Sequence, residues 1–492
     1  MFERISPEAA GVDSGKVFEF VSTLERRGLN THSLLLMKGD RVFGEFYWEP
    51  FDMDFCHRMY SETKSYVAIA IGLLEEDGVL DLDGKIASYF PEKYEAELPE
   101  FMADLTVREM LTMTTCRPGN YWFSFDEPDR TKLYFRPGDG TRPSGTVWEY
   151  DSSGSQVLGA LVEKLSGMGL FDFLNSRIFT HLGTFKTAEI LKTKNEDSWA
   201  DSALICTTRD MASFGRLLMN GGNHNGKQLI NSAYVAKATS AVVDNRENCH
   251  GNVFAHGYGY QIWRTEQNSF AFNGMGCQFT VCTPDKDLLM VITGDNQGNA
   301  SAASLIIGAY MDLIVSPAGK APLAENEAWK KKLDSLGESL KLRAIRGMAD
   351  SPLRGEIEGK TYICRENHAG ITKFSFSFSG DRGVLRYTNA QGDKELPFGI
   401  NKNLFGKFPQ LGYADGHGGV VTENGFMYDD AVSACWTQEN KLWIFVQITD
   451  RYFGNCSMSF SFKDNMAVCR MQKTAEDFLN EYQGTIVAQT EN

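Results

Sequence analysis

The spacing of hydrophobic residues near the N-terminus predicts a helix followed by a β-hairpin. Residues 14–27 place Val17, Phe20 and Leu24 on one face at helical spacing. Residues 33–47 form two apolar runs around a Lys-Gly-Asp turn, which is typical of a hairpin. A helix packed on an antiparallel sheet is therefore expected early in the chain.

A second apolar helical pattern begins at Ser61 and ends near Glu76, before an Asp-Gly pair that favours a helix C-terminus. Ser61 is therefore expected at the N-terminus of a helix. Further helical patterns cover residues 106–114, 154–166, 169–178, 208–220 and 302–315. Strand-like runs cover residues 257–264, 270–283 and 287–294. Strands at both ends with helices between them predict one α+β unit whose sheet combines sequence-distant segments.

The pattern changes after residue 315. Residues 316–349 begin with Ser, Pro, Ala and Gly and continue into a charged helix, which we interpret as a linker. Residues 350–492 contain short strands separated by turns, with a helical pattern near residues 475–482. We therefore predict a first domain, the α+β unit, at 1–315, a linker at 316–349, and a C-terminal all-β domain, a barrel or a sandwich, with a helical tail at 350–492.

Composition narrows the classes of function. The chain has 492 residues, of which 42% are hydrophobic, enough for two globular domains. A net charge of −15 disfavours nucleic acid and anionic membranes as partners. The N-terminus lacks a secretory pattern and no later run is long enough to span a bilayer, so we expect a cytoplasmic protein. The ten cysteines lack metal-site spacing, and we expect neither a metal nor another cofactor.

The first candidate for chemistry is Ser61, with Lys64 three residues further on. A serine hydroxyl needs a nearby base to act as a nucleophile, and on a helix the side chains at i and i+3 share a face. The pair alone is a weak signal. Its alternative interpretation is an exposed helix cap beside a solvated lysine.

The second candidate is Tyr150, which stands in a loop before the helical pattern at 154–166. A tyrosine there could share a proton with Lys64 and Ser61 and act first as a base and then as an acid. Ser152, two residues on, could hydrogen-bond the lysine or a substrate carbonyl. The alternative interpretation is a core tyrosine with a satisfied hydroxyl.

The third candidate is the segment that contains Phe272, Asn273 and Gly274, within an edge-strand pattern. Glycine there lets a substrate approach the backbone. The N–H of Met275 could join the N–H of Ser61 in an oxyanion hole. The alternative interpretation is a plain hairpin bulge.

Together, these three motifs resemble those of the serine β-lactamase and penicillin-binding-protein-like family, near its class C and esterase branches. Residues 105–115 and 203–215 also look like stretches typical of that family, and the resemblance covers about residues 5–315. It implies a helical region facing an antiparallel sheet, a site between them, an acyl-serine intermediate, and Ser61, Lys64 and Tyr150 as catalytic residues.

Two positions depart from the family pattern. Ser152 stands where class C members have Asn, and Phe272 stands where members that recognise β-lactams have Lys or His. Without that cation a β-lactam carboxylate loses its main partner, so the resemblance implies a neutral ester or small amide as substrate. Tyr121 and Trp122 could wall an apolar acyl pocket, although core packing explains them equally well.

The sequence therefore predicts a serine hydrolase that acts on a small ester or amide. One alternative is an acyltransferase that uses the same residues and an alcohol or amine acceptor. Another is a non-catalytic ligand-binding or sensor protein on the same fold. Homodimerisation through the C-terminal domain stays open.

Overall fold

The computed structural model describes residues 2–94, 97–119, 127–136, 141–249, 252–411, 426–476 and 478–490. The chain forms two compact units, Met1–Lys341 and Leu342–Asn492. Each unit has its own sheet, and the predicted α+β fold with a separate all-β C-terminal domain is confirmed.

The first unit is built on a seven-stranded sheet. Neighbouring strands in this sheet are antiparallel, except that the short first strand is parallel to β3. In spatial order the strands are β1 (Glu3–Arg4), β3 (Arg41–Tyr47), β2 (Thr31–Lys38), β12 (Leu288–Gly294), β11 (Gln278–Thr283), β10 (Ser269–Gly274) and β9 (Trp263–Thr265). The central pair joins β2 to β12, so both ends of this unit meet in the middle of the sheet.

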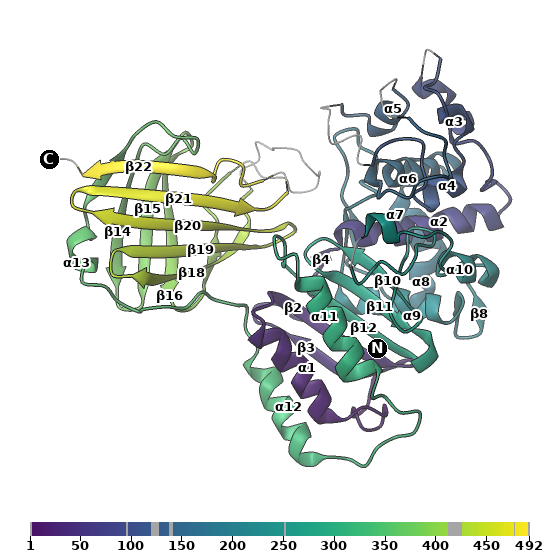
Figure 1. Ribbon diagram of the computed structural model, residues 1–492, viewed down its shortest axis with the longest axis horizontal. Coiled ribbons are helices and arrows are strands. Elements are labelled where there is room, and N and C mark those ends of the chain that lie inside the picture. Colours follow the sequence, from purple (N-terminus) through teal and green to yellow (C-terminus); the bar gives the residue numbers. More distant parts are fainter. Residues whose placement is uncertain are drawn as a thin grey trace. The chain divides into compact units, whose positions relative to one another are not determined.

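Both faces of this sheet are covered by helices (Figure 1). Successive residues of a strand point to opposite faces. Leu34 and Leu36 of β2 accordingly join the core beneath α1 and α11, whereas Leu35 and Met37 join the core beneath α2 and α9. The helices of the unit are α1 (Ser14–Arg26), α2 (Thr63–Glu76), α3 (Ile86–Tyr89), α4 (Val107–Leu111), α5 (Arg130–Tyr134), α6 (Ser152–Ser166), α7 (Leu170–Leu174), α8 (Thr180–Leu182), α9 (Thr208–Met219), α10 (Ser232–Ala238), α11 (Ala302–Tyr310) and α12 (Glu327–Ser339).

Three small strands lie beside the start of α2. They form a separate sheet in the order β4 (His57–Arg58), β6 (Leu204–Cys206) and β5 (Glu189–Ile190). A further two-stranded hairpin pairs β7 (Asn223–His224) with β8 (Lys227–Gln228). The three-stranded sheet matters for function because it ties the segment before Ser61 to the segment before α9.

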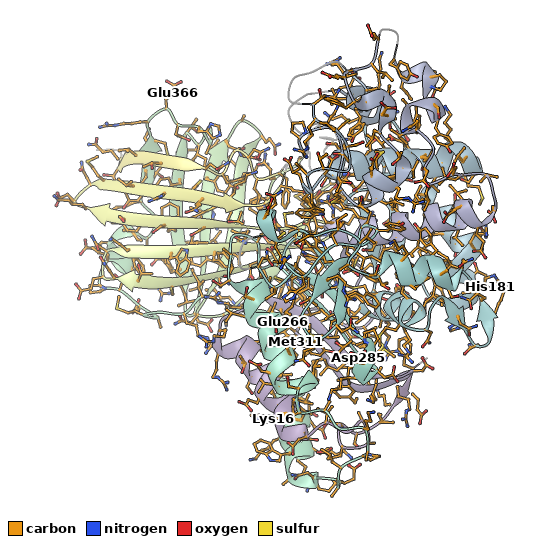
Figure 2. All side chains as sticks on the ribbon, turned by 45° about the vertical axis from the view of Figure 1, so that its right-hand side comes forward. Lys16, His181, Glu266, Asp285, Met311 and Glu366 are labelled. Atoms are coloured by element: carbon orange, nitrogen blue, oxygen red, sulfur yellow. The ribbon has the colours of Figure 1, made fainter. Side chains whose placement is uncertain are left out.

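The charged helix expected within the linker is α12, and it belongs to the first unit instead. It packs on α1, where the ring of Trp329 lies 5.4 Å from that of Phe18, and Leu333 is buried. α1 also carries partly exposed charged side chains, such as Lys16 (Figure 2), which pairs with Glu19. The charged pattern of α12 therefore reflects an amphipathic surface helix and not a free spacer.

The second unit is an all-β barrel with a short helix, α13 (Arg354–Ile357). Its sheet closes because the last residues of one strand, Gly399 and Ile400, pair in parallel with Ser433 and Ala434. The strands are β16 (Gly392–Ile400), β15 (Arg382–Asn389), β14 (Lys373–Ser379), β13 (Thr361–Cys364), β22 (Gly484–Thr490), β21 (Met466–Thr474), β20 (Phe453–Lys463), β19 (Lys441–Thr449), β18 (Asp429–Gln438) and β17 (Leu404–Lys407). Figure 1 shows them wrapping around one core.

Two expectations about these elements are wrong. The described residues between 475 and 490 contain no helix, and Gly484–Thr490 forms a barrel strand with Ile486 and Ala488 facing inward. Residues 257–264 are mostly irregular, because only β9 continues the sheet. Short alternating runs fit both an edge strand and an amphipathic turn, so spacing alone does not separate them.

Among the described residues, the helices are too short or too polar to traverse a lipid bilayer.

Candidate active site

Ser61 lies in a 3-10 turn, Tyr60–Glu62, that leads directly into α2. The preceding Met59 donates its backbone N–H to Leu204 O at 2.7 Å, which fixes this turn to β6. Tyr60 adopts a left-handed backbone with φ of 48°, an uncommon and strained conformation for a tyrosine. Its ring is buried beneath the Arg58 guanidinium, 4.4 Å from the ring centroid. Packing on both sides therefore holds the half-buried Ser61 in a defined place.

Lys64 lies one turn into the helix with its side chain buried. Its Nζ donates hydrogen bonds to Ser61 Oγ at 2.9 Å and to the backbone oxygen of Asp201 at 2.7 Å. The solvated-lysine interpretation of the Ser-x-x-Lys pair is therefore wrong.

Tyr150 approaches the same lysine from the segment before α6. Lys64 Nζ lies 5.2 Å from the centroid of the tyrosine ring, and the ring stacks on Trp263 at a centroid distance of 5.6 Å. A Cβ on Gly119 would come within 2.1 Å of the Tyr150 carbonyl oxygen, so only glycine fits beneath this backbone. The structure thus brings Ser61, Lys64 and Tyr150 together, while their catalytic roles stay predictions.

The third motif lies at the end of β10, against the turn that carries Ser61. A Cβ on Gly274 would lie 2.0 Å from the carbonyl oxygen of Met59, so the two backbones are in close approach. The strand is followed by a tight turn in which Cys277 has a φ of 73°. Gln278 closes that turn with a hydrogen bond to Met275 O at 3.0 Å. The end of β10 therefore lies against the Ser61 turn, and participation of the Met275 N–H in an oxyanion hole stays a prediction.

The predicted substrate-binding residues occupy different environments. Ser152 is buried as the first residue of α6, and Asn273 is half-buried. Phe272 is completely buried in the core on the helical side of the sheet, with its ring 5.8 Å from Phe214. Tyr121 and Trp122 lie outside the described residues. A substrate-binding role for any of these residues stays a prediction.

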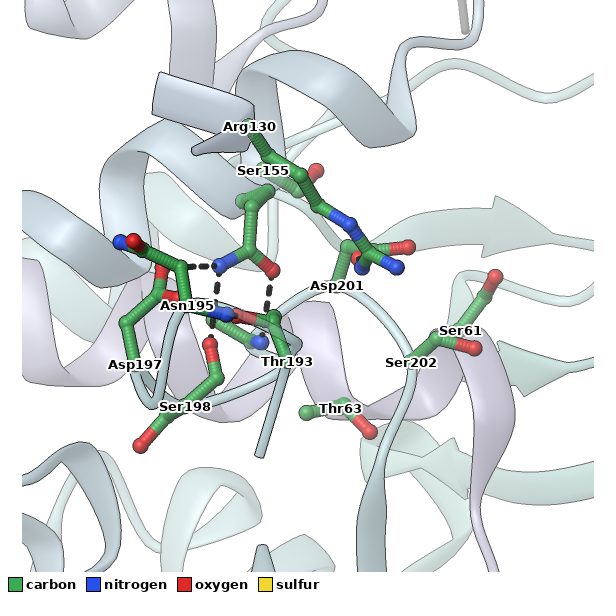
Figure 3. A network of polar contacts seen from close by, with 12 residues as sticks. Ser61, Thr63, Arg130, Ser155, Thr193, Asn195, Asp197, Ser198, Asp201 and Ser202 are labelled. Atoms are coloured by element: carbon green, nitrogen blue, oxygen red, sulfur yellow. Dashed lines mark hydrogen bonds and ion pairs between the residues drawn. The ribbon is translucent and has the colours of Figure 1, made fainter. Parts of the chain in front are cut away.

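Sequence reasoning missed the loop that connects β5 to β6. Gln156 of α6 donates to Asp197 Oδ2 at 3.1 Å and to Ser198 O at 2.8 Å, and its Oε1 accepts from the N–H of Ala200 at 2.9 Å (Figure 3). These bonds place Asp201, whose carbonyl oxygen holds Lys64. No side-chain pattern could reveal a contact made by a main-chain oxygen.

Glu62, the neighbour of Ser61, points away from it into the protein. Its carboxyl group is buried and accepts a hydrogen bond from Thr280 Oγ1 at 2.7 Å. Burial raises the pKa of this carboxyl group to about 8, partly offset by the Thr280 bond. The Glu62 carboxyl group, buried beside the Ser61 turn, is therefore protonated and neutral over most of the physiological pH range.

His57 of β4, the strand that precedes Ser61, forms a buried pair with His32 of β2. The Nε2 of His57 lies 3.2 Å from His32 Nδ1 and 3.2 Å from Thr293 Oγ1. Burial lowers the pKa of His57 to about 3, so this ring stays neutral in the folded protein at ordinary pH.

Comparison with known proteins matches a family model described as Beta-lactamase to residues 19–307. The 6-aminohexanoate-dimer hydrolase of Paenarthrobacter ureafaciens is 23% identical over 263 residues, which cover 50% of this chain and 67% of that protein. Penicillin-binding protein 4* of Bacillus subtilis (strain 168) is 28% identical over 145 residues, 26% of this chain. The chain spans only 29% of that second relative.

Solved structures share the fold of the first unit. A penicillin-binding protein homologue from Caulobacter crescentus has a TM-score of 0.50 and 17% identity, covering 62% of this chain and 99% of that chain. EstCE1, described as a hydrolase with promiscuous acyltransferase activity, has a TM-score of 0.50 and 13% identity, covering 60% of this chain and 99% of that chain. At these identities the likeness concerns the fold alone.

Proposed function

Because the chain belongs to the beta-lactamase family, we propose that it is a serine hydrolase that acts on a small ester or amide through an acyl-serine intermediate. The observation that carries this proposal is the hydrogen bond of 2.9 Å from Lys64 Nζ to Ser61 Oγ, with the Tyr150 ring beside the same ammonium. A buried lysine aimed at a serine hydroxyl is the arrangement that activates a nucleophile.

The reaction proceeds in two balanced steps. Ser61 Oγ attacks the substrate carbonyl carbon, and its proton passes to Tyr150, which Lys64 assists. The N–H groups of Ser61 and Met275 stabilise the oxyanion. The leaving alcohol or amine departs with that proton as its bond to carbon breaks. Water then attacks the acyl carbon, gives a proton back through Tyr150, and releases the acid and free Ser61.

A neutral ester or small amide is the preferred substrate class. The third motif carries Phe272 where β-lactam-recognising members have a cation, and this ring is buried in the core. A chromogenic cephalosporin is therefore expected to turn over slowly or not at all. The relative named for the 6-aminohexanoate dimer supports including small amides in a substrate panel.

The test is covalent labelling with p-nitrophenyl acetate. The acetyl group is expected on the peptide that contains Ser61, and Ser61→Ala should abolish turnover without unfolding the protein. Ser65→Ala is the matched control, because Ser65 lies on the same helix but bonds Gln261 O instead of the site. Turnover that survives in Ser61→Ala would refute the proposal.

An acyltransferase would use the same first step and a different acceptor in the second. Product analysis with added alcohols separates the two activities. Partition toward the acylated alcohol at low acceptor concentration would assign a transferase. Release of free acid under the same conditions supports the hydrolase. A burst of one equivalent without steady-state turnover would instead indicate a sensor that forms a stable adduct.

A further inference from the structure

The side chain of Asp201 is a buried carboxylate next to Lys64, and the family resemblance assigned it no role. Its carboxylate is 2% exposed and one oxygen, Oδ2, lies 3.9 Å from Lys64 Nζ. The other oxygen, Oδ1, accepts no hydrogen bond within the described part of the chain. Burying a carboxylate so poorly hydrogen-bonded is costly unless nearby cations compensate it.

Those cations surround the carboxylate on two sides. Arg130 of α5 lies 3.9 Å from Oδ1, opposite the oxygen that faces Lys64. Figure 3 shows Arg130, Asp201 and Ser61 in one close view. The guanidinium of Arg130 also lies 4.8 Å from the ring centroid of Trp199, which limits its freedom to approach more closely. Asp201 therefore lies between the lysine of the site and an arginine at its edge.

The backbone around Asp201 is held in place independently of its charge. On one side Gln156 binds the N–H of Ala200, and on the other Arg58 donates to Ser202 O at 3.0 Å and to Ser202 Oγ at 3.2 Å. These bonds do not involve the carboxylate. Removing its charge should therefore leave the loop, and the carbonyl that binds Lys64, in position.

We propose that Asp201 is a positioning residue, whose carboxylate is the counter-charge that keeps the Lys64 ammonium directed at Ser61 and Tyr150, and that Arg130 weakens this effect. This inference rests on the proposed hydrolase function. Opposite charges within about 4 Å favour each other's ionised forms, whereas a second cation competes for the same carboxylate.

Other charged or titratable groups lie on the described elements around this pair. Tyr150 faces Lys64 from the segment before α6, and Arg130 faces Asp201 from α5. Arg58 of β4 lies against Trp199, with its guanidinium 4.4 Å from that ring centroid. Glu62 faces Thr280 on the sheet side. Of these groups, only Arg130 forms an ion pair with Asp201 from the side opposite Lys64, so it provides the sharpest comparison.

The experiment compares pH profiles of kcat/KM for p-nitrophenyl acetate in the full-length protein. Asp201→Asn keeps the shape and the backbone carbonyl but removes the charge. We expect the alkaline limb to move to lower pH, because the Lys64 ammonium would lose a nearby opposite charge. Arg130→Gln should move the same limb to higher pH. Asp201→Glu should restore part of the wild-type profile.

The matched control is Glu196→Gln. It removes an exposed carboxylate from the same loop, where Glu196 pairs with Lys192. Its profile should keep the wild-type pH limbs. A uniform loss of activity in Asp201→Asn at every pH, or a profile identical to that of the wild type, overturns the inference and leaves the hydrolase intact. Turnover that persists in Ser61→Ala instead overturns the proposed function, so the two failures are distinguishable.

Discussion

The buried carboxyl group of Glu62 should make the stability of the first unit fall as pH rises. Its pKa is about 8 in the folded protein, compared with an ordinary value of 4.5. Between these two values the folded state holds a proton that the unfolded state has released. By linkage, the free energy of unfolding then decreases with increasing pH and levels off above pH 8.

The magnitude follows from the size of this shift. Each pKa unit corresponds to about 1.4 kcal/mol, so a gap of about 3.5 units amounts to about 5 kcal/mol over the whole interval. Glu62→Gln keeps an oxygen that can accept the bond from Thr280 Oγ1 and removes the ionisation. The variant should resemble the wild type near pH 5 and exceed it in stability by about 4 kcal/mol near pH 8.5.

Urea unfolding followed by tryptophan fluorescence, at half-unit steps from pH 5 to pH 9, measures this difference directly. Subtracting the variant from the wild type cancels every other titrating group, including the barrel domain. A stability difference that stays constant across this range would refute the reasoning, because it would mean that Glu62 ionises as freely in the folded protein as in the unfolded chain.

Three further predictions concern other parts of the first unit. Gly274→Ala should lower kcat by about 100-fold, because the added Cβ would clash with the carbonyl oxygen of Met59 and displace the proposed oxyanion donor, the N–H of Met275. Gly308→Ala should leave kcat unchanged, because a Cβ there meets no other atom within 4 Å, and steady-state kinetics of both variants measures the difference. His57→Gln should reduce the loss of stability on acidification. The pKa of His57 is about 3 in the folded protein and 6.5 ordinarily, so between these values only the unfolded state takes up the proton, which lowers the free energy of unfolding by about 1.4 kcal/mol per pH unit. An acid unfolding transition that is unchanged in the variant would refute this. Leu333→Ala should cost about 2 to 4 kcal/mol in denaturant unfolding if α12 is part of this core, and almost nothing if α12 is a spacer.

The sequence predicted the architecture well where elements are long and strongly patterned. The first helix and the hairpin after it lie within a few residues of their predicted positions. The predictions failed where the spacing of apolar residues does not reveal what an element packs against in the folded protein. The helix Glu327–Ser339 is amphipathic, but its many charged residues led to its interpretation as a linker, and its buried position, Leu333, was not recognised. The final strand was missed because its apolar positions are few and follow a stretch with helical spacing.

The candidate site shows the same division. Ser61, Lys64 and Tyr150 were predictable because their motifs together resemble those of a known family, although each motif alone is a weak signal, and the fold brings the three residues together. Asp201 was not predictable, because it contacts Lys64 through a main-chain oxygen, and its carboxylate lies 3.9 Å from Lys64 Nζ although 137 positions separate the two residues in the sequence. Gln156 was not either, because a buried glutamine on a helix carries no signal of the loop that it binds.

The pairing of β2 with β12 has a consequence for biosynthesis. About 250 residues separate the end of one strand from the start of the other. At about 5 to 20 residues per second, the ribosome needs roughly 10 to 50 s to deliver the partner. During that interval the nascent hairpin exposes the apolar edge strand that later lies at the centre of the sheet. A nascent-chain chaperone that shields this edge until translation passes residue 294 would therefore raise the yield of folded protein.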